Sequence, residues 1–85
     1  MISYPKIQAV HPLAGKRLRV TFATGTTKIY DCTPLLKELA FAPLKDEWFF
    51  RHVQADRSGF GVVWNDSVDL SESEVWINGT TEQPT

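Results

Sequence analysis

The sequence predicts a small α+β domain in which a mostly antiparallel sheet of about five strands packs on one short helix. Apolar and polar residues alternate strictly over residues 17–22, which is typical of a strand with one buried face. A β-branched and aromatic run over residues 60–64, between glycines and a polar turn, indicates a second such strand. Between them, Thr33 followed by Pro34 is a common helix start. The expected order is three strands, a helix, two strands and a short helix.

Length and composition favour a single domain. With 85 residues, of which 42% are hydrophobic and 12% aromatic, the chain can bury one modest core and not two. We expect this domain to span residues 1–78. Residues 79–85 are polar and end in Gln-Pro-Thr, so we expect them to form a flexible C-terminal tail.

The first three strands are expected at residues 6–10, at residues 17–22 and after the turn at residues 23–25. In the second of these strands the apolar positions that should face the core are Leu18, Val20 and Phe22.

The register of the third strand can be argued from the cost of burying a charge. A two-residue loop would turn Asp31 towards Leu18 on the inner face, where an unpaired carboxylate is expensive. A three-residue loop with Gly25 in a left-handed conformation instead turns Tyr30 and Cys32 inward and leaves Asp31 in water. We therefore expect the three-residue loop.

In the middle of the chain, Thr33 as N-cap and Pro34 predict a short helix that ends before Pro43. Residues 49–55 are expected to form the next strand, and the turn at residues 56–59 should lead into the strand at 60–64. The side chains that we expect to point inward from this hairpin are Phe50, Val53, Ala55, Val62 and Trp64.

Near the C-terminus, Ser71 and Glu74 have the spacing of a capping box, in which a serine N-cap is followed three residues later by a glutamate. One turn of helix is expected to follow.

Several of these segments together resemble the bacterial domain of unknown function 2442 family, over residues 5–77. The segments that carry the resemblance are Tyr30–Leu36, Leu44–Asp46, Phe50, Val53, Trp64 and Asp69–Ser71. The resemblance implies a β-rich α+β fold, no established activity, and a gene beside that of a second small family, as in toxin–antitoxin or paired regulatory systems. Longer members fuse a similar N-terminal domain to a helix-turn-helix. We expect no helix-turn-helix in this chain, so the resemblance does not carry a DNA-binding role over to it. Cys32 also departs from the family, which more often has leucine at this position.

No residue set in the sequence indicates catalysis, so we expect no catalytic residue and no cofactor. The single Cys32 has no disulfide mate, and with His11 and His52 it is the only nucleophile set; an inward thiol before a helix is usually an apolar filler. We also expect no metal site. The C-terminal acids could gather around a divalent cation, but they lack EF-hand spacing and have turn and cap roles; they are Asp66, Asp69, Glu72 and Glu74.

The chain contains neither an apolar run near the roughly 18 residues of a membrane span nor a signal-peptide layout at residues 1–5. We expect a cytoplasmic protein that does not enter a membrane.

Two function classes remain, and a protein-interaction module is the favoured one. It would bind a neighbouring-gene product, or a second copy, through Trp48, Phe49 and the outward Ile29. The alternative is a weak nucleic-acid-binding module that uses a basic strand face made by Arg17 and Arg19, with Lys28 reaching from the sheet edge. The net charge of −1 favours the first class, because nucleic-acid binding usually accompanies a basic domain.

Overall fold

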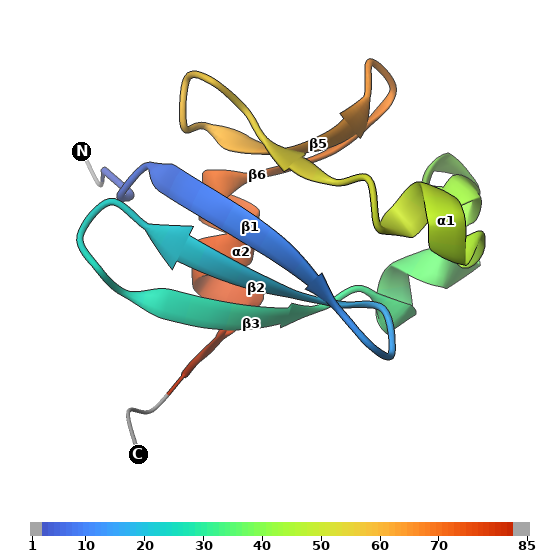
Figure 1. Cartoon of the computed structure of the whole chain (residues 1–85), viewed down its shortest axis with the longest axis horizontal. Helices are drawn as coiled ribbons and strands as arrows, with labels where there is room; N and C mark the ends of the chain where they lie inside the picture. The colour runs from blue at the N-terminus through green and yellow to red at the C-terminus, as the bar shows by residue number, and fades with distance from the viewer. Residues whose placement is uncertain (1–2, 83–85) are drawn as a thin grey trace.

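The computed structural model describes residues 3–82, which form two small antiparallel sheets and several short helices (Figure 1). The strands are β1 (Ile7–Leu13), β2 (Arg17–Phe22), β3 (Thr27–Asp31), β4 (Gln54–Ala55), β5 (Gly61–Asn65), β6 (Val68–Ser71) and β7 (Thr80–Thr81). The helices are the 3₁₀ helices η1 (Thr33–Lys37) and η2 (Leu39–Lys45) and the α-helices α1 (Glu47–Phe50) and α2 (Glu72–Asn78). The α+β class is confirmed.

The strands divide between two sheets instead of forming the single sheet of about five strands that the sequence suggested. One sheet has the order β1-β2-β3-β7 and the other the order β4-β5-β6. A strand that sequence reasoning did not separate, β6, pairs with β5.

The register expected for β2 and β3 is confirmed. Leu18 pairs with Tyr30, and the Asp31 side chain is exposed while Tyr30 is only 4% exposed. Gly25 has φ 93°, and its N–H donates to the Phe22 carbonyl over 2.9 Å, which closes the three-residue loop. Glycine adopts this left-handed conformation without a Cβ clash.

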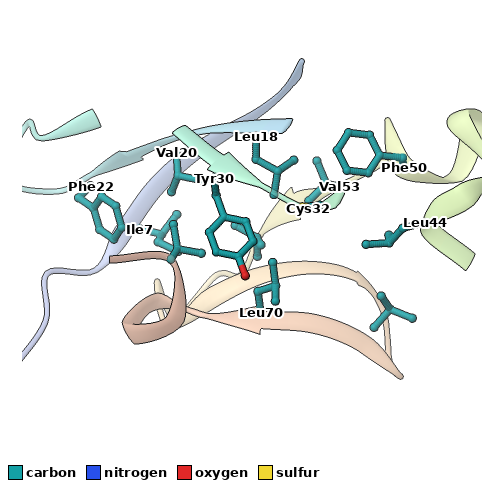
Figure 2. Packing of buried hydrophobic residues seen from close by; sticks show 13 residues of the cluster. Ile7, Leu18, Val20, Phe22, Tyr30, Cys32, Leu44, Phe50, Val53 and Leu70 are labelled. Atoms are coloured by element: carbon teal, nitrogen blue, oxygen red, sulfur yellow. The ribbon is translucent and has the colours of Figure 1, made fainter. Parts of the chain in front are cut away.

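The two sheets meet along β1. The N–H of Ile7 donates to the Gly59 carbonyl over 2.8 Å, and β1 also contacts β4 and β5. Gly59 has φ 82°, and a Cβ there would lie 2.7 Å from the Cβ of Lys6, so this junction requires glycine. Side chains from both sheets then fill one core between them (Figure 2).

The helix start differs from the prediction at Thr33. The N-cap of η1 is Cys32 and makes no side-chain cap bond, whereas the Thr33 hydroxyl and N–H both donate to the Asp31 carboxylate, over 2.8 and 2.9 Å. An aspartate that binds the backbone two residues ahead competes with a helix N-cap. The segment is consequently a 3₁₀ helix that begins one residue earlier than a threonine cap would place it.

The strand predicted over residues 49–55 is wrong for most of its length. Asp46 caps α1 by accepting the N–H of Phe49 over 3.1 Å, and only Gln54–Ala55 pairs with β5. The cap and the helical bonds that follow it outweigh the β propensity of the aromatic run. Phe50 and Val53 are nevertheless buried and Ala55 is half-buried, as predicted.

The C-terminal helix begins at the predicted cap. The Ser71 hydroxyl accepts the N–H of Glu74 over 3.1 Å, and α2 continues for seven residues instead of one turn. Beyond it, β7 pairs with Lys28 and Ile29 of β3, so residues 80–81 differ from the expected tail. The rest of that prediction, at residues 83–85, lies outside the described residues.

Candidate interaction surfaces

Helix α1 separates two of the aromatic residues that the sequence singled out. The side chain of Trp48 is 72% exposed, whereas Phe49 is half-buried and packs against the core beside the fully buried Phe50. A four-residue helix cannot turn three consecutive aromatic side chains inward, because successive residues point about 100° apart around the axis. Trp48 is the one left in water.

The exposed indole of Trp48 is contacted by His52, which lies in the turn after α1. The His52 ring lies against it with 4.1 Å between ring centroids, and His52 Nδ1 is 2.7 Å from the Trp48 carbonyl oxygen. At the start of the same helix, Glu47 pairs with Lys16 Nζ at 2.5 Å. The contact with His52 restricts the Trp48 ring, and the Glu47–Lys16 pair holds the start of the helix that carries it.

A second exposed apolar residue was missed by sequence reasoning. Leu39, at the start of η2, is 90% exposed, and η2 packs against α1. The preceding Glu38 has an extended backbone, with φ −90° and ψ 134°, which interrupts the helix expected through this segment. Leu35 and Leu36 therefore pack on the core while Leu39 does not.

Ile29 does not join Trp48. It lies in β3 between its pairing partners Arg19 of β2 and Thr80 of β7, where it is half-buried. The side chain thus belongs to the outer face of the four-stranded sheet.

The structure brings together only some of the basic residues of the alternative hypothesis, which is nucleic-acid binding. Arg17 and Arg19 lie on the outer face of β2, but Arg19 binds Glu82 over 3.1 Å and Arg17 Nε donates to the Ala14 carbonyl over 3.1 Å. Lys28 lies on the other face, where its Nζ donates to the Trp76 carbonyl over 2.6 Å and sits 4.3 Å from that ring centroid. The three side chains form no common surface.

A cleft that the sequence did not reveal lies between β6 and the η1–η2 segment. Its volume is about 350 Å³, and it is lined by Leu35, Glu38, Phe41, Asp69, Leu70, Ser71 and Glu74. The Glu74 carboxylate is held there by two donors, the Tyr30 hydroxyl and Asn78 Nδ2, each at 2.8 Å. Burial and the contact with Glu74 raise the pKa of Tyr30, so its hydroxyl remains a donor throughout the physiological range.

The thiol of Cys32 is fully buried, and burial raises its pKa to about 12. A thiol in this environment is neutral and inaccessible, which is the opposite of what a nucleophile needs. Within residues 3–82, no three side chains of His, Cys, Asp or Glu are grouped so as to hold a metal ion. In the same part of the chain, no helix combines the length and the hydropathy that crossing a bilayer requires.

The fold is that of a small α+β domain with two antiparallel sheets, and a few large apolar side chains such as Trp48 and Leu39 are exposed on its surface. The chain belongs to the family described as "Protein of unknown function (DUF2442)", whose model matches residues 7–79. This match confirms the resemblance seen in the sequence.

The chain is also similar to a solved structure, "Crystal Structure of Putative DNA Binding Protein NE0471 from Nitrosomonas europaea ATCC 19718". The two share 34% sequence identity with a TM-score of 0.76. The match covers 92% of this chain and 52% of the other, so this chain spans about half the length of that protein. No curated protein matches the chain.

Proposed function

We propose that this domain is a protein-interaction module, of the antitoxin or adaptor type, which binds the product of a neighbouring gene through apolar side chains exposed around α1. The observation that carries the proposal is the position of Trp48. Its side chain is 72% exposed, whereas Trp64 and Trp76 are packed against the core.

An exposed tryptophan suits a binding anchor for two physical reasons. Tryptophan is over-represented among the few residues that supply most of the binding energy of protein interfaces. In addition, the contact with the tilted His52 ring restricts the Trp48 ring in the free domain, so less side-chain entropy remains to be lost on binding. The half-buried Phe49 fixes the helix that presents the ring.

The proposal includes a cytoplasmic location and no catalytic step. A single cysteine suits a reducing compartment. The same cysteine is the buried Cys32 and is unsuited to nucleophilic attack.

Weak nucleic-acid binding through Arg17 and Arg19 is the second candidate. It is favoured by the description of the similar Nitrosomonas europaea protein as a putative DNA-binding protein. It is disfavoured by the pairing of Arg19 with Glu82, by the position of Lys28 on the other face and by the net charge of −1.

One titration separates the two candidates. The full chain is mixed with the neighbouring-gene product, with mixed-sequence duplex DNA and with RNA, each at low and moderate salt. The variants are Trp48→Ala and the double change Arg17→Ala with Arg19→Ala. Phe60→Ala is the matched control, because Phe60 is an aromatic that is 58% exposed at a different turn of the molecule.

We expect protein binding that survives moderate salt and falls roughly thirtyfold in Trp48→Ala, as for a residue that contributes about 2 kcal/mol. Phe60→Ala and the arginine variant should bind the protein as the wild type does. Nucleic-acid binding that disappears with salt and with the arginine changes would replace the proposal by the second candidate. Binding of neither, with self-association in solution, would assign the surface to a homo-oligomer.

A further inference from the structure

The cleft beside β6 combines segments that are far apart in the sequence. Leu35 lies in η1, Phe41 lies in η2 and Glu38 lies between these two helices. Asp69, Leu70 and Ser71 are consecutive in β6. Neighbouring residues of a strand point to opposite faces of a sheet. A cleft that touches three consecutive strand residues must therefore run along the edge of the strand. We call it the β6-edge cleft.

This edge carries free backbone groups. β6 is the outermost strand of the sheet order β4-β5-β6. The N–H of Glu72 donates to the Phe60 carbonyl over 2.9 Å, which fixes the phase of the antiparallel ladder. Because facing residues alternate between bonded and non-bonded pairs, the N–H and C=O of Asp69 point away from β5 and along the cleft. An exposed strand edge of this kind can pair with another extended chain.

The side chains of the cleft divide by chemistry. Its apolar members are Leu35, Phe41 and Leu70, and its charged members are Glu38, Asp69 and Glu74. No lining residue is basic. The carboxylates are also spread out, since the described residues contain no acidic group of three that could hold a metal ion. An apolar floor with separated acids suits an extended ligand with several charges better than a single cation.

The two faces of β6 determine how apolar and cationic side chains would alternate along such a ligand. Leu70 is buried and points towards the core side, whereas Asp69 is exposed on the opposite face. A strand added beside β6 would have the same alternation, with apolar side chains towards Leu70 and cationic ones towards Asp69. A volume of about 350 Å³ is at the small end of ligand sites and accommodates one or two side chains.

We propose that the β6-edge cleft binds an extended segment of a partner protein in which lysine or arginine alternates with apolar residues. The segment adds a strand to β6 through its backbone, as in other β-augmentation complexes. Its apolar side chains pack on Leu35, Phe41 and Leu70, and its cations pair with the exposed carboxylates of Glu38 and Asp69. This site is separate from Trp48 and goes beyond the function proposed above.

Glu74 lies on the core side of the cleft, because its partner Tyr30 is buried. Its carboxylate accepts hydrogen bonds from Tyr30 and Asn78, both at 2.8 Å, so its position is fixed without a cation. Asp69 and Glu38 are exposed and form the acidic rim.

The test uses a labelled peptide of about eight alternating Lys and Val residues, a length typical of a strand. Two matched peptides replace Lys by Glu or carry N-methyl groups along the backbone. Fluorescence anisotropy gives the affinities, and amide chemical shifts locate the peptide on the full chain. The protein variants are Glu38→Lys and Asp69→Lys. Asp66→Lys, in the turn before β6 and outside the cleft lining, is the control with the same charge change.

We expect the Lys–Val peptide to bind, with shifts over residues 35–41 and 69–71. Affinity should fall roughly tenfold in each cleft variant and remain within about twofold in Asp66→Lys. The Glu–Val and N-methylated peptides should not bind. Absence of binding at about 1 mM peptide, equal binding of the Lys and Glu peptides, or shifts at another surface would each overturn the proposal.

Failure of this inference can be told apart from failure of the proposed function. Trp48→Ala should still bind the peptide, because Trp48 is not among the lining residues. Loss of partner binding in Trp48→Ala would support the proposed function whatever the peptide does. Self-association of the wild type that Asp69→Lys abolishes would assign the cleft to a second copy of this chain and overturn the choice of partner.

Discussion

At the scale of single residues, Tyr30 connects the two halves of the chain. It lies on β3 with its ring in the core (Figure 2), and its hydroxyl donates to Glu74 of α2 over 2.8 Å. A hydrogen bond from a buried hydroxyl to a carboxylate is stronger than a neutral one. It also satisfies a polar atom that would be costly to bury alone.

Tyr30→Phe should lower the free energy of unfolding by about 1–2 kcal/mol, because the ring keeps its packing and only the charge-assisted hydrogen bond is lost. The measurement is the urea midpoint with an unchanged m-value. Tyr4→Phe is the control, since Tyr4 is a tyrosine outside the buried core cluster of the described residues. Equal midpoints for Tyr30→Phe and the wild type would show that the bond contributes nothing to stability.

The buried Cys32 should make the folding stability of the domain fall at alkaline pH. Its pKa rises from 9.0 to about 12 on folding, chiefly because of burial. The unfolded chain therefore releases the thiol proton first, and the stabilisation is complete below pH 9 and lost as the pH rises from 9 towards 12. Up to about 1.4 kcal/mol per pH unit can be lost in this way.

Cys32→Ala should remove this alkaline slope, although it lowers stability at neutral pH by leaving a small cavity. Urea unfolding between pH 8 and 10 measures it, a window that ends at the ordinary pKa of 10.0 for Tyr30 and so limits that residue's contribution. Parallel pH dependences for variant and wild type would contradict the assignment to Cys32.

At the scale of elements, Trp64 joins strand β5 to helix α1. Its indole N–H donates to the Phe50 carbonyl over 2.9 Å, and its ring lies 6.1 Å from the Phe50 ring. The ring is half-buried and packs against the core, so it is less enclosed than the strand alternation predicted. The contact nevertheless satisfies a carbonyl at the end of a helix that is only one turn long.

Trp64→Ala should destabilise the domain by about 3 kcal/mol, at the low end for tryptophan because the ring is only half-buried. Trp64→Phe keeps most of the packing and loses the hydrogen bond, so about 1 kcal/mol is expected. Trp48→Ala is the exposed control and should change stability by less than about 0.5 kcal/mol. Thermal or urea melts that rank Trp48→Ala with Trp64→Ala would mean that Trp48 is structural.

An element could be predicted from the sequence where its own residues alternate between apolar and polar, and not where the deciding contact is a helix cap. The alternation of Leu18, Val20 and Phe22 records one-sided burial directly, and the cost of burying Asp31 was enough to choose the register of β3. The aromatic run Trp48–Phe50 has no alternation, so its propensity suggested a strand where the Asp46 cap begins a helix.

The candidate sites were harder to predict than the strands, because they depend on tertiary contacts. The exposure of Trp48 could be anticipated, since three adjacent aromatics cannot all be buried. By contrast, Lys28 was grouped with Arg17 and Arg19, although it pairs with the buried Val20 of β2 and therefore lies on the other face, where it contacts the Trp76 carbonyl. The β6-edge cleft arises from segments about thirty residues apart and has no local sequence signal.

At the scale of the whole molecule, the two sheets share one core. The buried cluster contains residues from both sheets, and a backbone bond joins Ile7 of β1 to Gly59 of the β4–β5 turn. The fully buried side chains of this shared core are Leu18, Val20, Phe22, Cys32, Leu44, Phe50, Val62 and Val75. Neither sheet has a second apolar layer of its own, so separating the sheets would expose the inner faces of both.

The sheets should therefore unfold together in a single cooperative transition. Two tryptophans make this testable, since Trp64 reports on the three-stranded sheet and Trp76 contacts Phe22 of the four-stranded sheet with 5.0 Å between ring centroids. Trp48→Phe combined with either Trp64→Phe or Trp76→Phe leaves one reporter in each protein. Fluorescence and far-UV circular dichroism should give the same urea midpoint within each of these proteins. A fluorescence midpoint of Trp64 well below the circular-dichroism midpoint of the same protein would mean that β4-β5-β6 opens first. In that case the chain would consist of two cooperative units, and the shared core would be too weak to couple them.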